Sequence, residues 1–219
     1  MRLVLVGPPA SGKGTQANVL TEHLGVPKIS TGDMLRAARA AGTKLGREAE
    51  TFMNAGQLVP DEVVIGLVDE RLNEADAKAG FILDGFPRTV PQAEALAALL
   101  ERRGTALDAV VQIDVPRELL MERATLRRTD KRTGQIYHLK YNPPPPGADL
   151  EHRVDDREET VGTRLDQYDA MTAALLPHYQ KQGLLRRIDG VGDPKNVTER
   201  LLAALGDPTQ GKNAQGQGS

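Results

Sequence analysis

The chain has 219 residues with 28 basic and 30 acidic side chains and a net charge of −2, so it lacks the basic excess typical of proteins that bind nucleic acid or anionic membranes. It contains no cysteine, which excludes disulfides, thiolate zinc ligands and a cysteine nucleophile. The sequence has no apolar leader and no apolar run of about 18 residues, so we expect a cytoplasmic protein with no membrane partner.

The first predicted strand, residues 3–6, leads into the loop G-P-P-A-S-G-K-G-T, residues 7–15. This loop almost fits the phosphate-binding pattern G-x-x-x-x-G-K-[S/T], but Gly14 stands where a hydroxyl residue normally ligates magnesium, and Thr15 follows one position late. Backbone N–H groups of such a loop, the start of the next helix and Lys13 can bind phosphate oxygens. A tight turn without a ligand is the alternative, but the flanking strand and helix favour a nucleotide site.

Short apolar runs alternate with helical patterns along the rest of the chain. The predicted strands are residues 3–6, 27–30, 81–83, 109–115 and 184–188. The predicted helices are residues 15–24, 61–75, 91–103, 116–126 and a long helix from 157 to about 182. This alternation predicts an α/β fold in which helices cover both faces of a parallel sheet.

Two segments interrupt the alternation. We expect residues 30–59 to hold only small helices, and residues 127–156 to be an irregular, turn-rich insertion because of the proline run 143–146. The predicted single domain, residues 1–206, then has a core of 1–29, 60–126 and 157–206. Asp156 and Glu159 have the spacing of N-cap and N3 in the long helix. We expect the tail, 207–219, to be disordered.

Asp84 ends the strand at 81–83, and Arg88 follows it closely. Ligands bind at the carboxyl ends of strands in such sheets, where an aspartate can hold magnesium, usually through water. A strand-ending turn with a solvated arginine is an equally good interpretation of this segment taken alone.

Several arginines have no partner in the local sequence. Arg123 and Arg127 are four residues apart on one predicted helix face, Arg153 precedes the long helix, and Arg164 lies within it. Solvated surface charge is the simpler explanation, but phosphoryl transfer requires fixed positive charges around the transferring group.

Taken together, these blocks resemble the adenylate kinases of the long-lid bacterial type, from Met1 to about Gly206. The blocks that carry the resemblance are 7–16, 30–33 with Arg36, 56–60, 84–89 with Gln92, 137–138 with 142–144, and 153–156 with Arg164. The family's loop reads G-K-G-T, which accounts for Gly14. The resemblance implies a P-loop nucleotide kinase with five parallel strands in the order 2-3-1-4-5, an AMP-binding insertion at 30–59 and a lid at 127–156.

The resemblance also implies a monomer that transfers a phosphoryl group from ATP to AMP to give two ADP. Magnesium accompanies ATP, with Asp84 behind its waters. The implied ATP-binding residues are Ala10, Ser11, Gly12, Lys13, Gly14, Thr15, Arg123, Arg127, Ile136, Tyr137 and Arg187. The implied AMP-binding residues are Thr31, Arg36, Gln57, Leu58, Val59, Gly85, Phe86, Pro87, Arg88, Gln92, Arg153 and Arg164. The implied catalytic residues are Lys13, Arg88, Arg123, Arg153 and Arg164.

Many relatives hold a structural zinc in the lid, but here Asp130 and Thr133 stand at the first pair of ligand positions, and a deletion removes the second pair. His138 and His152 lie nearby but are separated, so we expect a lid without zinc.

Two other functions remain open from the sequence. Another nucleoside monophosphate kinase, with GTP as donor or a pyrimidine nucleotide as acceptor, would use the same loop. A nucleotide-dependent switch is a further alternative, although the chain lacks the N-K-x-D motif of GTPases.

Overall fold

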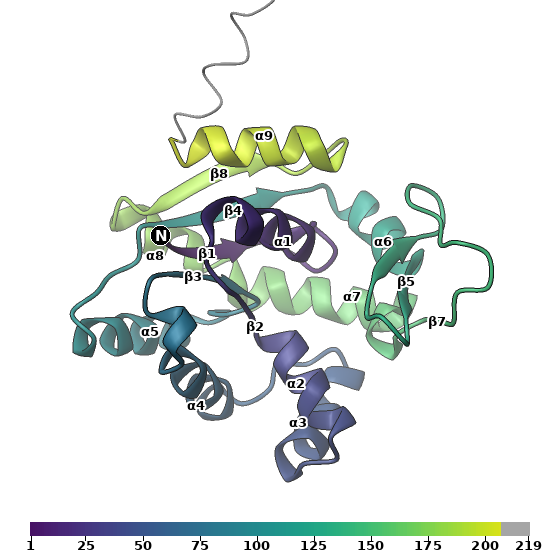
Figure 1. Ribbon diagram of the computed structural model, residues 1–219, viewed down its shortest axis with the longest axis horizontal. Coiled ribbons are helices and arrows are strands. Elements are labelled where there is room, and N and C mark those ends of the chain that lie inside the picture. The colour runs from purple at the N-terminus through teal and green to yellow at the C-terminus, as the bar shows by residue number, and fades with distance from the viewer. Residues whose placement is uncertain (207–219) are drawn as a thin grey trace, which may run out of the picture.

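Figure 1 shows the computed structural model of the chain, in which residues 1–206 are described. The predicted disordered tail, 207–219, lies outside the described residues. No helix in residues 1–206 is long and apolar enough to cross a membrane.

The central sheet has five parallel strands in the order β2-β3-β1-β4-β8. These strands are β1 (Arg2–Val6), β2 (Lys28–Ser30), β3 (Phe81–Asp84), β4 (Ala109–Asp114) and β8 (Leu185–Asp189). Counted along the sheet's own strands, this is the expected order 2-3-1-4-5, so the predicted fold class is confirmed.

Helices cover both faces of this sheet (Figure 1). They include α1 (Lys13–Leu24), α4 (Asp61–Leu72), α5 (Val90–Arg102), α6 (Arg117–Thr125), α7 (Glu158–Gln167), α8 (Leu175–Lys181) and α9 (Pro194–Ala204). Alternate residues of β1 enter different hydrophobic clusters: Leu3 and Leu5 pack with α1, α6, α7 and α9, whereas Val4 and Val6 pack with α4, α5 and α8. Because helices cover both faces of the sheet, a ligand can reach it only at the strand ends, and in such sheets it binds at the carboxyl ends.

The first insertion contains α2 (Thr31–Ala40) and α3 (Lys44–Asn54) and no strand, as predicted. Ser30 is the N-cap of α2, because its hydroxyl accepts a hydrogen bond from the Asp33 backbone N–H at 3.3 Å. The two helices extend below the sheet in Figure 1.

The second insertion forms a small antiparallel sheet that the sequence analysis did not predict. Its strands are β5 (Arg127–Asp130), β6 (Ile136–His138) and β7 (Leu150–Glu151), in the order β6-β5-β7. It lies on the right in Figure 1, apart from the central sheet. The prediction that Arg127 lies on the same helix as Arg123 is therefore wrong: α6 ends at Thr125, and Arg127 pairs with His138 in β5.

The long predicted helix is interrupted. A short 3₁₀ turn, η2 (Val154–Asp156), precedes α7, and a π-helical turn, η3 (Tyr168–Thr172), separates α7 from α8. The predicted N-cap, Asp156, is wrong, because Arg157 takes that position without a side-chain cap. The Asp156 carboxylate instead accepts hydrogen bonds from Arg127.

The remaining helix boundaries differ in detail. The predicted helix 61–75 ends at Leu72 and is followed by a 3₁₀ turn, η1 (Ala75–Ala77). Helix α9 was not predicted, although Asp193 caps it through the Lys195 backbone N–H at 2.8 Å and Pro194 occupies its first position.

Candidate functional site

The glycine loop connects β1 to α1 at the carboxyl edge of the sheet. Gly12 ends the loop in the left-handed region with φ 96°. A Cβ on Gly7 would lie 2.7 Å from the Ile113 carbonyl oxygen and from the Ser11 hydroxyl, closer than packing allows. Glycine is therefore required at both ends of the loop, for conformation at Gly12 and for space at Gly7.

Lys13 folds back over this loop. Its Nζ donates hydrogen bonds to the carbonyl oxygens of Gly7 and Pro8, both at 2.7 Å. Burial lowers the pKa of Lys13 to about 7, although the nearby Asp84 carboxylate acts in the opposite direction. A phosphate bound here would favour the charged form of the lysine and offer it a stronger acceptor than a carbonyl.

Asp84 ends β3 directly beside the loop. It is in register with Leu5 of β1 and Ser30 of β2, and its Oδ2 would lie 3.5 Å from a Cβ on Gly14. A carboxylate oxygen next to a phosphate-binding loop suits Mg²⁺, which binds oxygen ligands and keeps several waters. In residues 1–206, no group of three or more His, Asp or Glu side chains is placed to hold a metal ion by itself.

An open pocket, whose space of about 580 Å³ includes open solvent, lies between α2, the segment 56–59 and the end of β3. It brings together nine of the twelve residues expected to bind AMP: Thr31, Arg36, Gln57, Leu58, Val59, Gly85, Arg88, Gln92 and Arg164. The other three do not line it: Phe86 is fully buried in the core, Pro87 follows it through a cis peptide bond, and Arg153 belongs to the second insertion, between β7 and η2.

The Gly85 carbonyl organises two of these side chains. It accepts hydrogen bonds from the Thr31 hydroxyl at 3.0 Å and from Arg88 Nε at 2.8 Å. Gly85 has φ 82°, and a Cβ there would lie 3.1 Å from Arg88 Nη2. Burial lowers the pKa of Arg88, against the attraction of Asp84. An anion in the pocket would compensate for the lost hydration of this guanidinium.

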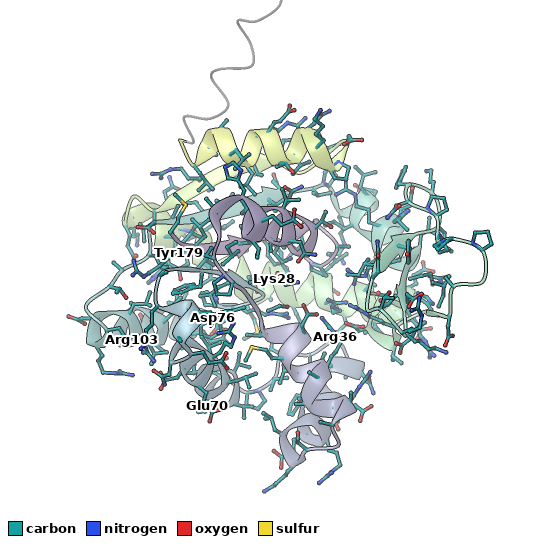
Figure 2. The ribbon with its side chains drawn as sticks, viewed as in Figure 1. Lys28, Arg36, Glu70, Asp76, Arg103 and Tyr179 are labelled. Atoms are coloured by element: carbon teal, nitrogen blue, oxygen red, sulfur yellow. The ribbon has the colours of Figure 1, made fainter. Side chains whose placement is uncertain are left out.

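Arg36 has an acidic partner on its own helix. Its Nη2 donates to Asp33 Oδ1 at 2.6 Å, and Lys28 Nζ lies 3.3 Å from Asp33 Oδ2. Figure 2 shows Lys28 and Arg36 near the point where β2 leads into α2. Burial acts to raise the pKa of Asp33, but the hydrogen bond and charge of Arg36, with Lys28, hold that pKa at about 2.

Two further arginines pair with carboxylates of η2. Arg127 binds Asp156 through Nε, at 2.8 Å, and through Nη2, while Arg164 Nη1 lies 3.2 Å from Asp155 Oδ2. Both aspartates therefore hold arginine side chains in place. Burial lowers the pKa of Arg164 to about 10, opposed by Asp155 and assisted by Arg127.

Arg153 adds a further charge to this group. Burial lowers its pKa, and the neighbouring charges of Arg36 and Arg127 lower it further. Burial also acts to raise the pKa of Asp155, but Arg164 and three other arginines hold it below its usual value. The carboxylates therefore compensate only part of the positive charge gathered at this edge.

Four other predicted site residues lie elsewhere. Arg123 donates from both Nη atoms to the Gly190 carbonyl, each at 3.2 Å. Arg187 is in β8 with its side chain on Gln180. Ile136, which is 47% exposed, and Tyr137 are in β6 of the second insertion.

The sequence analysis missed part of the apolar lining of the pocket. Leu35, Met53 and Val64 line it, together with Gly32, Gly56 and Asp155. The three apolar residues lie on α2, α3 and α4 and share the helical periodicity of core positions. That pattern alone does not distinguish a pocket wall from the core.

Comparison with known proteins gives a consistent result. The family model described as adenylate kinase matches residues 5–184. A protein from Sorangium cellulosum named adenylate kinase is 60% identical over 214 residues, covering 96% of this chain and 99% of its own. Proteins of the same name from Moorella thermoacetica and Syntrophotalea carbinolica are 55% and 49% identical; each alignment covers 94% of this chain, and 98% and 99% of theirs.

Proposed function

The chain belongs to the adenylate kinase family, and on this premise we propose which of its residues carry out the reaction. It is a phosphotransferase that moves a phosphoryl group reversibly from ATP to AMP and gives two ADP, and so contributes to adenine nucleotide homeostasis. Its substrates are nucleotides, and adenylate kinases in general use Mg²⁺ with ATP.

We propose that the 580 Å³ pocket binds AMP. The observation that carries this proposal is the meeting of Thr31, Arg36, Arg88 and Gln92 around one opening at the carboxyl edge of the sheet, beside the loop that holds Lys13. Arg36 and Arg88 would bind the phosphate. The nucleoside would contact Gln57, Leu58, Val59 and the carbonyl group of Gly85. Phe86 and Pro87 would support the turn from behind.

The donor ATP would bind on the other side of Lys13. Residues 10–15 would supply backbone N–H groups to its phosphates, with Arg127 as a further cation. Arg123, whose Nη1 donates to the carbonyl of Gly190 just after β8, would be another cation at the ATP phosphates. The backbone of Arg187 would border the adenine. Ile136 and Tyr137 would reach the nucleoside from the lid, residues 127–156.

The transfer itself needs position and charge more than covalent chemistry. Lys13, Arg88, Arg123, Arg153 and Arg164 would neutralise the transferring phosphoryl group. Closure of the two insertions, 30–59 and 127–156, over the core would exclude water, so that AMP accepts the phosphoryl group. The ionised AMP phosphate needs no separate base.

Asp84 fits the role of holding Mg²⁺ through water, since its carboxylate lies beside Gly14. When bound, Mg²⁺ withdraws charge from the phosphate oxygens. Gly14 leaves room for this arrangement where other phosphate loops carry a hydroxyl ligand.

We also propose that the lid holds no structural zinc. Asp130 Oδ1 already accepts hydrogen bonds from the Arg132 and Thr133 backbone N–H groups and from the Thr133 hydroxyl, at 2.8–3.0 Å. Elemental analysis of the purified protein should find no stoichiometric zinc, and a one-to-one content would contradict this. A monomeric state and a cytoplasmic location remain predictions.

The test is a rate assay of ADP formation with ATP or GTP as donor and AMP, GMP, CMP or UMP as acceptor. We expect AMP to be the preferred acceptor and Lys13→Ala to reduce turnover about a thousandfold or more with an unchanged circular dichroism spectrum. A pyrimidine nucleotide preferred over AMP would contradict the proposed acceptor site, and a loss below tenfold would contradict the role of Lys13.

A further inference from the structure

The side-chain amide of Gln92 is held from two sides. Its Oε1 accepts a hydrogen bond from the Arg88 backbone N–H at 2.7 Å, and its Nε2 donates to Asp61 Oδ1 at 2.7 Å. Gln92 is only 2% exposed, yet it lines the pocket. The Gln92 amide is therefore held in a fixed position at the wall of the pocket.

These two partners allow only one orientation of the amide. A backbone N–H can only donate, and a carboxylate oxygen can only accept. Rotating the amide by 180° would bring Oε1 against the carboxylate and Nε2 against the N–H group, and both hydrogen bonds would be lost in a buried place where such losses are costly. The positions of oxygen and nitrogen in Gln92 thus follow from the network.

Asp61 is itself fixed. Its Oδ2 accepts from the Thr89 hydroxyl at 2.8 Å, and Thr89 caps α5 by accepting from the Gln92 backbone N–H. Asp61 is the first residue of α4 and does not line the pocket. Asp61 therefore contacts Gln92 on the side away from the pocket, and it can affect a ligand only through Gln92.

The fixed orientation leaves Gln92 one N–H group and one oxygen lone pair for a ligand. Adenine presents an acceptor at N1 and a donor at its 6-amino group, so it complements an amide. A 6-oxopurine such as hypoxanthine presents a donor at N1 and an acceptor at O6. An amide free to rotate could bind either base, but one held in place binds only one of the two patterns.

We propose that Asp61 is a specificity-determining positioning residue, which holds the Gln92 amide in the orientation that selects adenine over 6-oxopurine bases. This inference rests on the proposed function, in which Gln92 reads the acceptor base. Together with the Arg88 backbone N–H, Asp61 then supplies the discrimination that a freely rotating Gln92 amide would not have.

The experiment compares AMP with IMP, which differ only at N1 and the 6-substituent. In Asp61→Asn, the side chain keeps its shape but can donate as well as accept, so a rotated Gln92 amide keeps a hydrogen-bond partner at position 61. Only the Arg88 backbone N–H then still opposes the rotation. We expect the ratio of kcat/KM for AMP to that for IMP to fall at least tenfold, or by about 1.4 kcal/mol. The change should come mainly through KM, and circular dichroism should show an unchanged fold.

Asp69→Asn is the matched control, because Asp69 also links α4 to the C-terminal end of α5, through Arg103 Nη2 at 2.6 Å. Figure 2 shows Arg103 far across the molecule from Arg36. This variant should lose stability without a change in the AMP to IMP ratio. An equal fall in both variants would overturn the proposal by attributing the effect to helix packing.

Gln92→Leu separates this inference from the function on which it rests. We expect Gln92→Leu to abolish most of the discrimination, and Asp61→Asn to have no further effect on the ratio in that background. If Gln92→Leu retains full discrimination, Gln92 does not read the base and the proposed acceptor site is wrong. If Gln92→Leu loses discrimination but Asp61→Asn alone keeps it, only the role of Asp61 is overturned.

Discussion

Ala10, in the middle of the phosphate loop, has φ 63° and is the one non-glycine residue of the described chain with positive φ. The left-handed region costs an L-residue about 1–2 kcal/mol. Glycine removes this cost, but its greater conformational entropy stabilises the unfolded chain by about 0.4–1 kcal/mol. We therefore expect Ala10→Gly to raise the free energy of unfolding by about 0.5–1 kcal/mol, measured by urea denaturation.

Ala98→Gly is the control for this prediction. Ala98 is an exposed residue inside α5, where glycine costs about 1 kcal/mol relative to alanine. The two substitutions should change stability in opposite directions. If Ala10→Gly destabilises the protein as Ala98→Gly does, the loop conformation is not strained at Ala10.

Helix-cap spacing does not by itself identify the hydrogen-bond partner of a side chain. Ser30 caps α2 through the backbone N–H three residues along the chain. Asp156 has equally good cap spacing, but it pairs with Arg127 across 29 positions. A buried carboxylate pairs with the strongest available donor, and only the tertiary structure brings that donor close.

Among the elements, the long apolar or periodic ones were predictable and the short polar ones were not. Strand β4 carries five buried residues in succession, which is a clear signal for a buried parallel strand. Strands β5, β6 and β7 have two to four residues each, and none is a continuous apolar run. Their pairing depends on backbone hydrogen bonds between segments that carry little hydrophobic pattern.

Replacing residues 128–152 with a short Gly-Ser linker tests the role of the lid. All residues that line the 580 Å³ pocket lie outside this segment, and so do the five strands of the central sheet. We expect the variant to bind AMP within about a factor of ten of the intact protein, or about 1.4 kcal/mol. Turnover should be largely lost, because the lid no longer closes over ATP and excludes water.

Calorimetric titration with AMP beside a coupled assay of ADP formation gives both measurements. An intact central fold should appear as a retained cooperative melting transition. Near-normal turnover would show that the second insertion is only a surface structure, and loss of AMP binding would show that the pocket depends on the lid.

At the scale of the whole molecule, two hydrophobic clusters fix the sheet and its helices, while charge joins the parts around the site. Asp33 of α2 pairs with Lys28 of β2 and with Arg36. Asp155 of η2 pairs with Arg164 of α7, and the charge of Arg36 lowers the pKa of Asp155. The sequence showed these charges but not their partners, because they come from four separate elements.

Acid should weaken this arrangement in a defined pH window. The pKa of Asp33 lies at about 2 in the folded protein against 3.8 for the free side chain, so the unfolded chain binds more protons between these values. Its contribution to stability is therefore fully present above pH 4 and is lost as the pH falls through about 2. The lowered pKa of Asp155 acts in the same direction.

Asp33→Asn removes this contribution at all pH values. We expect the difference in Tm between the intact protein and Asp33→Asn to be constant near neutral pH, to shrink below pH 4 and to close near pH 2. Glu94→Gln, at an exposed position of α5, is the control for removal of one carboxyl group and should show a small difference in Tm that does not close near pH 2.

Since the side chain of Asp33 is 51% exposed, added salt should also reduce the Asp33 effect by screening. A difference in Tm that persists unchanged to pH 2 would mean that Asp33 stabilises α2 by its neutral hydrogen bonds, and not through the charges of Arg36 and Lys28.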